Sequence, residues 1–461
     1  MTTAITIGMI IIYVAIMMGI GVYTARQTRS VSDFVLGSHS VGSWLTAFAY
    51  GTSYFSAVVF IGYAGQFGWT YGVSAAWVGI GNALLGSLLA WIVLGRRTRI
   101  MTQSLGAKTM PEYFEKRWNS KGLKIAAALI VFVFLIPYTA SVYNGLSRLF
   151  NMAFQIESEG AYKIIIIVMA LLTAIYVILG GYAATAINDF IQGIVMLIGI
   201  AAVVICAIQN QGGLTSALAA LGEIEVNGKT NTLNSVFGPD PLNLLGVVIL
   251  TSLGTWGLPQ MIHKFYAIKS ENDIKKGAVI STVFALIVAG GSYLLGGFDR
   301  LFCTLTEDGS GKTVISTLSN GKPDFDAMIP SLLHTALPDI LIGLVVVLVL
   351  SASMSTLSSL VLTSSSTLTI DLIKPNLKKC SDKKEMLIMR VLIAVFLVIS
   401  VLLAFNKNAS ISTLMSYSWG ALAGAFLGPF MYGLFSRKIT KPAVWTSFIL
   451  GIGPRLPQVC R

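Results

Sequence analysis

One segment of this chain is unusually rich in hydroxyl side chains for its apolar surroundings. In SASMSTLSSLVLTSSST (351–367), 11 of 17 residues are serine or threonine. In a helix, Ser355, Ser358 and Ser359 would share one face, and Thr356 would lie about 100° round from it. Hydroxyl oxygens on two neighbouring faces suit a small hard cation such as sodium better than a soft metal. The alternative is that they bond back to carbonyls one turn earlier or join helices.

A carboxylate in an apolar stretch is the second candidate for chemistry. Asp189 lies in AINDFIQG, at the start of a stretch long enough to cross a membrane, and Gln192 shares its helical face. Taking a charge out of water is costly, so an ionisable group at membrane depth points to a functional site. The alternative is an ordinary helix N-cap, in which Asp189 accepts a backbone N–H of the first turn.

No grouping of residues predicts a catalytic or metal centre. The histidines are scattered, no Ser/His/Asp spacing appears, and the four cysteines lie far apart without a CxxC pattern. The sequence therefore predicts a protein that is not an enzyme and has no organic cofactor. The residues concerned are His39, His263, His334, Cys206, Cys303, Cys380 and Cys460.

The amino-acid composition indicates that these candidate residues lie in a membrane protein. Of 461 residues, 55% are hydrophobic and 11% are charged, with a mean hydropathy of +0.77, whereas a soluble domain carries about 25% charged residues. The bilayer is therefore the main solvent, and we expect a multi-pass protein of the cell (plasma or inner) membrane. The net charge of +12 does not indicate nucleic-acid binding, because the basic residues alternate from loop to loop instead of forming one face.

Apolar stretches of about 20 residues, the length of one crossing, recur along the chain. With the first connection taken as cytoplasmic, the inner loops and helix ends, among them 96–124 and 264–276, hold 23 Lys and Arg and the outer ones hold 7. This bias predicts an N-terminus outside. The eleven expected crossings are 4–24, 42–66, 70–95, 124–150, 162–180, 188–208, 243–266, 277–298, 338–372, 386–405 and 411–435.

Two of these crossings contain residues that interrupt a helix. Glycines and hydroxyls are mixed into YGTSYFSAVVFIGYAG (50–65), and GTWGLP (254–259) holds two glycines and a proline. Each opens a set of five crossings, and an odd number per set gives the two sets opposite orientations. Interrupted helices at matching positions of two halves predict a transporter site. The alternative is that each is a packing notch for a neighbouring helix.

Several motifs in the same order resemble the sodium/solute symporter family, which includes sodium/proline, pantothenate, sialic acid and sodium/sugar symporters. They are YGTSYFSAVVFIG, NGLSRLF after Tyr138, GGYAATAINDFIQ and SASMSTLSSLVLTSSSTLTIDL. The resemblance covers nearly the whole chain. It implies an all-α polytopic membrane protein with a five-plus-five inverted-repeat transporter fold, one extra N-terminal helix and a truncated C-terminal helix. The expected parts are 1–40 (extra helix and loop), 41–208 (first repeat), 209–242 (outer loop), 243–435 (second repeat) and 436–461 (incomplete helix).

The resemblance also implies where sodium would bind. The site common to the family matches backbone carbonyls and two hydroxyls at Thr52, Phe55, Ala352, Ser355 and Thr356. Members with a second sodium use an aspartate and serines that match Asp189, Ser355, Ser358 and Ser359. Sodium is thus the expected co-transported ion.

The solute is less well defined. Family substrates lie beside positions that match Ser56, Val59, Phe60, Tyr138, Trp256 and Pro259. Sugar carriers have Asn and Gln where this chain has Tyr54 and Val59, and proline carriers have Asp in place of Tyr54. Because a buried sugar needs many polar partners, we favour an amino acid such as proline, or a short monocarboxylate. The alternatives are a sugar or sialic acid symporter and, in a different class, a sodium-permeable channel or a sensor.

The expected partners follow from this interpretation. They are a small-molecule solute, sodium and the lipid bilayer, with no nucleic acid, and we expect the chain to act as a monomer.

Overall fold

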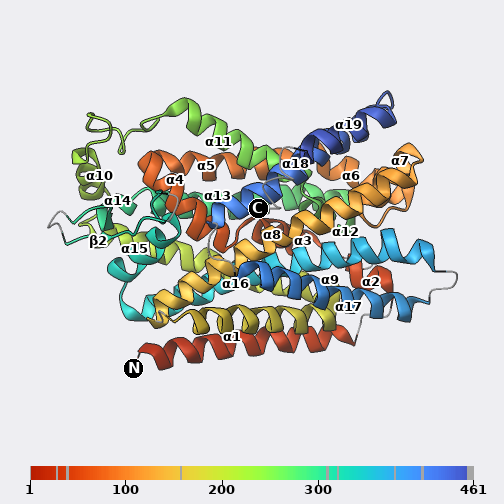
Figure 1. Cartoon of the computed structure of the whole chain (residues 1–461), viewed down its shortest axis with the longest axis horizontal. Coiled ribbons are helices and arrows are strands. Elements are labelled where there is room, and N and C mark those ends of the chain that lie inside the picture. Colours follow the sequence, from red (N-terminus) through yellow and green to blue (C-terminus); the bar gives the residue numbers. More distant parts are fainter. Residues whose placement is uncertain are drawn as a thin grey trace.

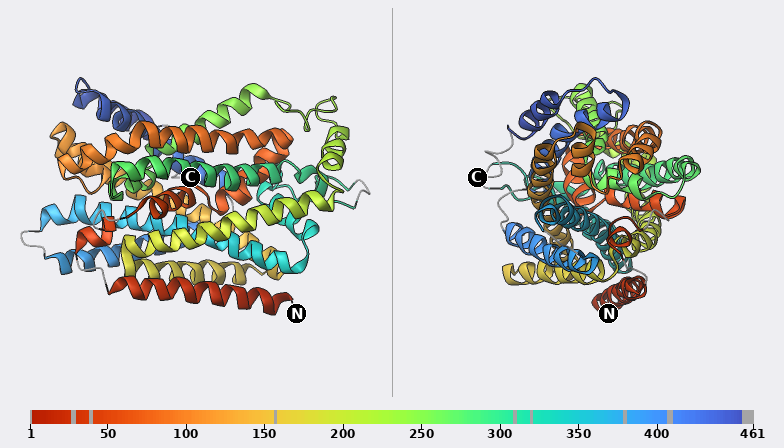
Figure 2. Two further views of the ribbon diagram at one scale, coloured as in Figure 1. Left: turned by 180° about the vertical axis from the view of Figure 1, so that it is seen from behind. Right: turned by 90° about the vertical axis from the view of Figure 1, so that its right-hand side faces the viewer.

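The protein is an elongated bundle of long helices that run along one common axis (Figures 1 and 2). The computed structural model describes residues 2–26, 30–37, 41–155, 158–307, 311–318, 321–377, 381–405 and 410–453. His39, Cys380, Cys460 and residues 454–461, the last part of the predicted incomplete helix, lie outside the described residues. The strands β1 (Cys303–Thr304) and β2 (Thr313–Val314) pair in parallel and form the one sheet within the described ranges.

Serine and threonine side chains start many of the helices. Ser30, Thr109, Ser120, Ser270 and Ser410 each accept a backbone N–H from the first turn, which satisfies a donor that has no partner inside the helix. The α-helices are α1 (Thr2–Ala25), α2 (Val31–Leu36), α3 (Ser43–Tyr54), α4 (Ala64–Tyr71), α5 (Ala76–Gly81), α6 (Arg96–Leu105), α7 (Met110–Trp118), α8 (Lys121–Phe154), α9 (Glu159–Asn210), α10 (Leu214–Glu223), α11 (Pro241–Leu253), α12 (Pro259–Ala267), α13 (Glu271–Gly296), α14 (Asp299–Phe302), α15 (Met328–Ala336), α16 (Asp339–Thr367), α17 (Asp382–Ala404), α18 (Ile411–Phe435) and α19 (Lys441–Ile452).

Seven helices in the described ranges are long and apolar enough to cross a membrane, or eight if the bent pair α11–α12 is one span. Two of the seven, Val58–Leu105 and Glu159–Asn210, have 48 and 52 residues, more than twice the roughly 20 that one crossing needs. The second is broken at Gly181, whose φ of 56° is outside the helical region. The second therefore covers the predicted crossings 162–180 and 188–208. The first covers 70–95 and the end of 42–66, whose beginning lies on α3, and α18 covers 411–435. All eleven predicted ranges fall on helices.

Both predicted helix interruptions are confirmed. The helix α3 ends at Tyr54, Phe55 is extended (φ −104°, ψ 126°), and a π-helical segment, Val58–Tyr63, then leads into α4. In the second, a 3-10 turn at Gly254–Gly257 follows α11, and α12 starts after an extended Leu258, with a bend of 53°. Both breaks expose backbone groups in the interior of the bundle.

The loops separate into two ends of the bundle. The helices α10, α14 and α15 gather at one end together with the N-terminus (Figures 1 and 2). They belong to the connections 209–242 and 299–337, both of which the predicted orientation places outside. The helices α6 and α7 from the predicted cytoplasmic loop 96–124 lie at the other end (Figure 1). Loops predicted to share a side of the membrane therefore share an end of the bundle.

The first broken helix lies unusually close to α13. A Cβ added at Gly68 of α4 would stand 2.0 Å from the carbonyl carbon and oxygen of Gly296, and one added at Gly296 would stand 2.1 Å from the carbonyl oxygen of Ala64. Both contacts are to backbone, which cannot rotate away as a side chain could. Glycine at these two positions allows the two backbones to touch.

We expect Gly68→Ala to lower the thermal unfolding midpoint of the purified protein, because its methyl group must push the two backbones apart, at a cost of about 1–3 kcal/mol. The matched control is Gly8→Ala in α1, where an added Cβ has nothing within 4 Å. That control should leave the midpoint unchanged or raise it slightly, since alanine favours a helix. Equal midpoints for the two variants would contradict the close approach.

Candidate functional site

The break in α3 meets the hydroxyl-rich part of α16. The Thr356 hydroxyl lies 3.3 Å from the Phe55 carbonyl oxygen and 3.2 Å from the Ala352 carbonyl oxygen. The neighbouring Ser355 hydroxyl is fully buried and forms no hydrogen bond of full geometry, although the Asp189 carboxylate lies beside it. Thr52 lies in the last turn of α3, where carbonyls lack helical donors, and its own hydroxyl donates to Phe48. The structure thus brings Phe55, Ala352 and Thr356 into contact, with Ser355 beside them.

This arrangement fits a small cation by its chemistry. It offers carbonyl and hydroxyl oxygens, the donor types that transporters use for sodium where a helix unwinds. The residues are at most 1% exposed, so water does not compete for these oxygens in this conformation. A buried hydroxyl without a full hydrogen bond, such as that of Ser355, costs stability unless a ligand satisfies it.

The residues matched to a second sodium site surround a different cation. The Lys264 ammonium of α12 donates to the Ser359 hydroxyl at 3.0 Å and lies 3.6 Å from the Asp189 carboxylate. The Ser359 hydroxyl also lies 2.8 Å from that of Ser53 in α3. The Ser358 hydroxyl donates to the Ser355 carbonyl, as membrane serines commonly do. Sequence reasoning missed Lys264 because it was counted with the basic residues of a cytoplasmic loop.

Two sequence-based interpretations are corrected here. Lys264 is 2% exposed inside the bundle, so it does not belong to the loop charges that orient the chain. Asp189 is not an N-cap, because it lies within α9 and eight residues beyond the kink at Gly181. Its carboxylate oxygens form no hydrogen bond of full geometry, and the polar side chains beside it are those of Lys264 and Ser355. A buried carboxylate beside a buried ammonium is the arrangement that the structure shows instead.

The six residues predicted to contact the solute are all buried, but their polar groups differ in availability. The Ser56 hydroxyl accepts the Val58 N–H, and the Trp256 ring N–H donates to the Leu85 carbonyl at 3.1 Å. By contrast, the Tyr138 hydroxyl forms no hydrogen bond of full geometry within the described ranges, and the Trp419 side chain lies beside it. Val59, Phe60 and Pro259 contribute only apolar surface, at the two helix breaks.

Two residues that sequence reasoning missed carry similar unused polar groups. The Trp419 ring N–H and both polar atoms of the Gln260 side chain are buried without a hydrogen bond of full geometry in the described part of the chain. The Trp419 ring contacts those of Tyr54 and Tyr138, each with centroids 6.1 Å apart. The signals that could have found them are a tryptophan among small residues in SYSWGALAG and a glutamine directly after Pro259.

Next to Trp419, a cavity of about 650 Å³ opens between α11 and α18. Its wall is mainly aliphatic, and its hydroxyls, those of Tyr63, Thr251 and Ser416, are few. None of the six predicted solute residues lines this cavity. Trp419 therefore both lines this cavity and contacts the ring of Tyr138.

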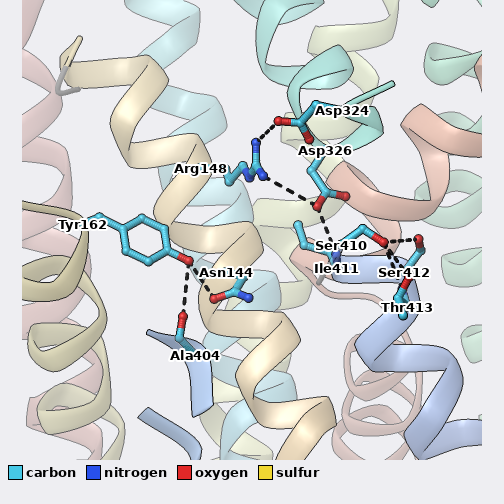
Figure 3. Close-up of polar contacts among 10 residues, drawn as sticks. All are labelled: Asn144, Arg148, Tyr162, Asp324, Asp326, Ala404, Ser410, Ile411, Ser412 and Thr413. Atoms are coloured by element: carbon cyan, nitrogen blue, oxygen red, sulfur yellow. Dashed lines mark hydrogen bonds and ion pairs between the residues drawn. The ribbon is translucent and has the colours of Figure 1, made fainter. Parts of the chain in front are cut away.

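An ionic cluster lies at the end of the bundle that carries α14 and α15, beside the segment Val58–Tyr63 (Figure 3). It fastens the loop that contains Asp324 and Asp326 to α8. Arg148 of α8 pairs with Asp324 at 2.5 Å and lies 4.0 Å from Asp326. Asp326 accepts the backbone N–H of Ile411, at the start of α18, at 2.9 Å. A Cβ at Gly62 would meet the Ile411 side chain at 2.9 Å, so this loop and α18 cover the segment Val58–Tyr63.

The comparisons with known proteins agree with each other. A model of the sodium:solute symporter family matches residues 34–451. Sodium/proline symporters of Staphylococcus aureus strains JH9 and USA300 are 30% identical over 453 residues, which cover 96% of this chain and 83% of theirs.

Two solved structures share the fold. A Na+-coupled sialic acid symporter in a substrate-bound outward-open state has a TM-score of 0.76 at 16% identity, covering 98% of this chain and 96% of its own. A nucleobase-cation-symport-1 family transporter in a closed conformation has a TM-score of 0.51 at 14% identity, covering 93% and 94%. The predicted all-α transporter fold is thereby confirmed, whereas the boundaries of its repeats stay a prediction.

The ionic cluster gives a testable pH dependence. Burial raises the pKa of Asp326 to about 6 from 3.8, although Arg148 opposes the shift. A carboxyl whose pKa is raised by folding contributes stability that is fully present below its unfolded pKa and is lost as pH rises through about 6. We expect the stability of the protein, relative to that of Asp326→Asn, to fall as the pH rises from about 4 to 7, by up to about 3 kcal/mol in unfolding free energy, of which roughly half is lost above pH 5.

The matched control is Glu159→Gln, which removes an exposed carboxylate and should show no such relative change. A midpoint difference between the protein and Asp326→Asn that stays constant over this pH range would contradict the raised pKa.

Proposed function

This chain belongs to the sodium:solute symporter family, and from that premise we propose that it drives uptake of an amino acid such as proline, or of a short monocarboxylate, by alternating access. Sodium is the co-transported ion of this family. The observation that carries the proposal is the contact of the Thr356 hydroxyl with the Phe55 carbonyl at the break of α3. An ion held there would strengthen the contact between α3 and α16, which already meet through the Thr356 hydroxyl and through Ser53 and Ser359.

We place the coupling sodium at Thr52, Phe55, Ala352, Ser355 and Thr356. A cation at these oxygens would hold the broken end of α3 against α16. The residue that follows Phe55 is Ser56, the first of the predicted solute contacts, so ion and solute would stabilise the same conformation of one short backbone segment. Binding of either would therefore strengthen binding of the other, because linkage between two sites is reciprocal.

The proposal for the solute rests on the scarcity of polar groups near the helix breaks. The Tyr54 hydroxyl is engaged with the Thr251 carbonyl at 2.9 Å, and Val59 offers no polar atom. Tyr138, Trp419 and Gln260 supply the unused polar groups, enough to orient a small solute but few for the many hydroxyls of a hexose. The Staphylococcus aureus relatives are sodium/proline symporters, which supports an amino acid. The main difference from proline carriers is Tyr54, which stands where those carriers have an aspartate.

A sugar or sialic acid symporter is the second candidate, favoured by the likeness of the fold to a sialic acid symporter. A sodium-permeable channel is disfavoured by the two broken helices within one chain, which are typical of alternating access. The relatives are transporters, which supports transport over catalysis. We further propose a cell-membrane location with the N-terminus outside, action as a monomer, and repeats at 41–208 and 243–435.

We expect Thr356→Ala and Ser355→Ala each to raise the sodium concentration for half-maximal transport at least about fivefold, because each removes one of about five oxygens around the ion and the loss exceeds the roughly 1 kcal/mol of an ordinary hydrogen bond. The measurement is uptake of labelled L-proline into proteoliposomes at a series of sodium concentrations. Thr356→Ser, which keeps the hydroxyl, should stay close to the parent protein.

The matched control is Ser366→Ala, which removes a buried hydroxyl of the same helix that donates to the Thr363 carbonyl. It should not change the sodium dependence. Unchanged sodium dependence in both the Thr356 and the Ser355 variants would remove this sodium site from the proposal.

For the solute, we expect L-proline or a short monocarboxylate, and not glucose or galactose, to compete for sodium-driven uptake. The assay compares uptake with and without an inward sodium gradient in the presence of each unlabelled competitor. Saturable sodium-dependent uptake of a hexose would overturn the assignment and favour the sugar alternative. Sodium flux without saturable uptake of any of these solutes would favour the channel.

A further inference from the structure

Lys264 is a buried cation inside the bundle, close to the proposed sodium site. It lies on α12, the part of the second broken helix that follows the turn Gly254–Gly257, and its side chain is 2% exposed. Its neighbours come from two other helices: Asp189 from α9, with a side chain that is 0% exposed, and Ser359 from α16. The ammonium also lies 5.4 Å from the centre of the Tyr182 ring, on its face.

These neighbours are the kinds of group that a bound sodium ion would use. A carboxylate, a serine hydroxyl and the face of an aromatic ring all stabilise a monovalent cation in an apolar interior. Asp189 and Ser359 also belong to the set that the family resemblance matched to a second sodium. In this chain the charge that neutralises Asp189 is supplied by a covalently attached ammonium.

We propose that the Lys264 ammonium takes the place of a second sodium ion, so that this chain binds and carries one sodium per transport cycle. The inference rests on the proposed sodium site at Thr356. A second cation entering beside Asp189 would meet the ammonium at short range, in surroundings that screen charge poorly. The carboxylate cannot neutralise both, so the lysine excludes the ion.

Lys264 also connects the two broken helices with each other. Ser359 is one turn beyond Ser355 on α16, and its hydroxyl reaches Ser53, near the end of α3. The ammonium therefore connects the second broken helix, through Ser359, with the first. A sodium ion in that place would leave the protein in each cycle, whereas the lysine stays and keeps the contact.

The competing interpretation is a purely structural ion pair, and counting bound sodium separates the two. The experiment measures binding of ²²Na⁺ by the purified full-length protein at saturating concentration. We expect one sodium per chain in the parent protein and two in Lys264→Met, where Asp189 is left without its cation. Thr356→Ala should bind clearly less than one sodium at a concentration that only just saturates the parent. The double variant Lys264→Met/Asp189→Asn should return to one, because its pocket no longer carries a charge.

The control for loss of a lysine is Lys275→Met on α13, an exposed residue, which should bind one sodium. Two sodium ions in the parent protein, or one in a Lys264→Met variant that is monodisperse, would overturn the inference. If Lys264→Met does not fold, Asp189→Asn in the parent background decides: a count that stays at one supports the inference, and a fall from two to one overturns it. A parent protein that binds no sodium would instead remove the proposed sodium site itself.

Discussion

Backbone groups freed inside an apolar bundle must find partners, and this constraint shapes the centre of the structure. Where α3 ends at Tyr54 and Phe55 is extended, carbonyl oxygens lose the helical donors that would satisfy them, and lipid or apolar side chains cannot replace those donors. The hydroxyl of Thr356 is placed to reach one of these carbonyls. The hydroxyl-rich stretch of α16 therefore supplies a hydrogen-bond donor to a carbonyl that the break in α3 leaves without one. The same carbonyl and hydroxyl oxygens suit a small cation.

Three groups of buried charges follow a related rule, because a charge in the interior is stabilised by an opposite charge beside it. At one end, Arg148 joins Asp324 and Asp326. Near the opposite end of α8, Lys124 pairs with Glu115 at 2.8 Å and lies 3.9 Å from Asp371. A third pair is formed by Asp189 and Lys264, whose charged groups lie 3.6 Å apart. The first two groups fasten loops or helix ends to the bundle, whereas the third pair joins transmembrane helices beside the proposed ion site.

Close helix packing sets how precisely these groups are held. At Gly68 and Gly296 the backbones of α4 and α13 touch directly, beside the stacked rings of Phe67 and Tyr293. Well-packed interiors have discrete arrangements and deform little in between. If the proposed sodium site is correct, alternating access would require this broken helix to change position as a unit.

Local patterns in the sequence determined the membrane class, the positions of the crossings and the two helix breaks, because hydropathy, glycine and proline act over a few residues. They also indicated Thr356 and Asp189 as candidates, since hydroxyls and carboxylates are rare in apolar stretches. Only the tertiary structure decided what those residues meet. Lys264 looked like a loop charge in the sequence, but it lies 95 residues from Ser359 along the chain and 3.0 Å from it in space. Which cation neutralises Asp189 depends on how three distant helices pack, and no local pattern encodes that contact.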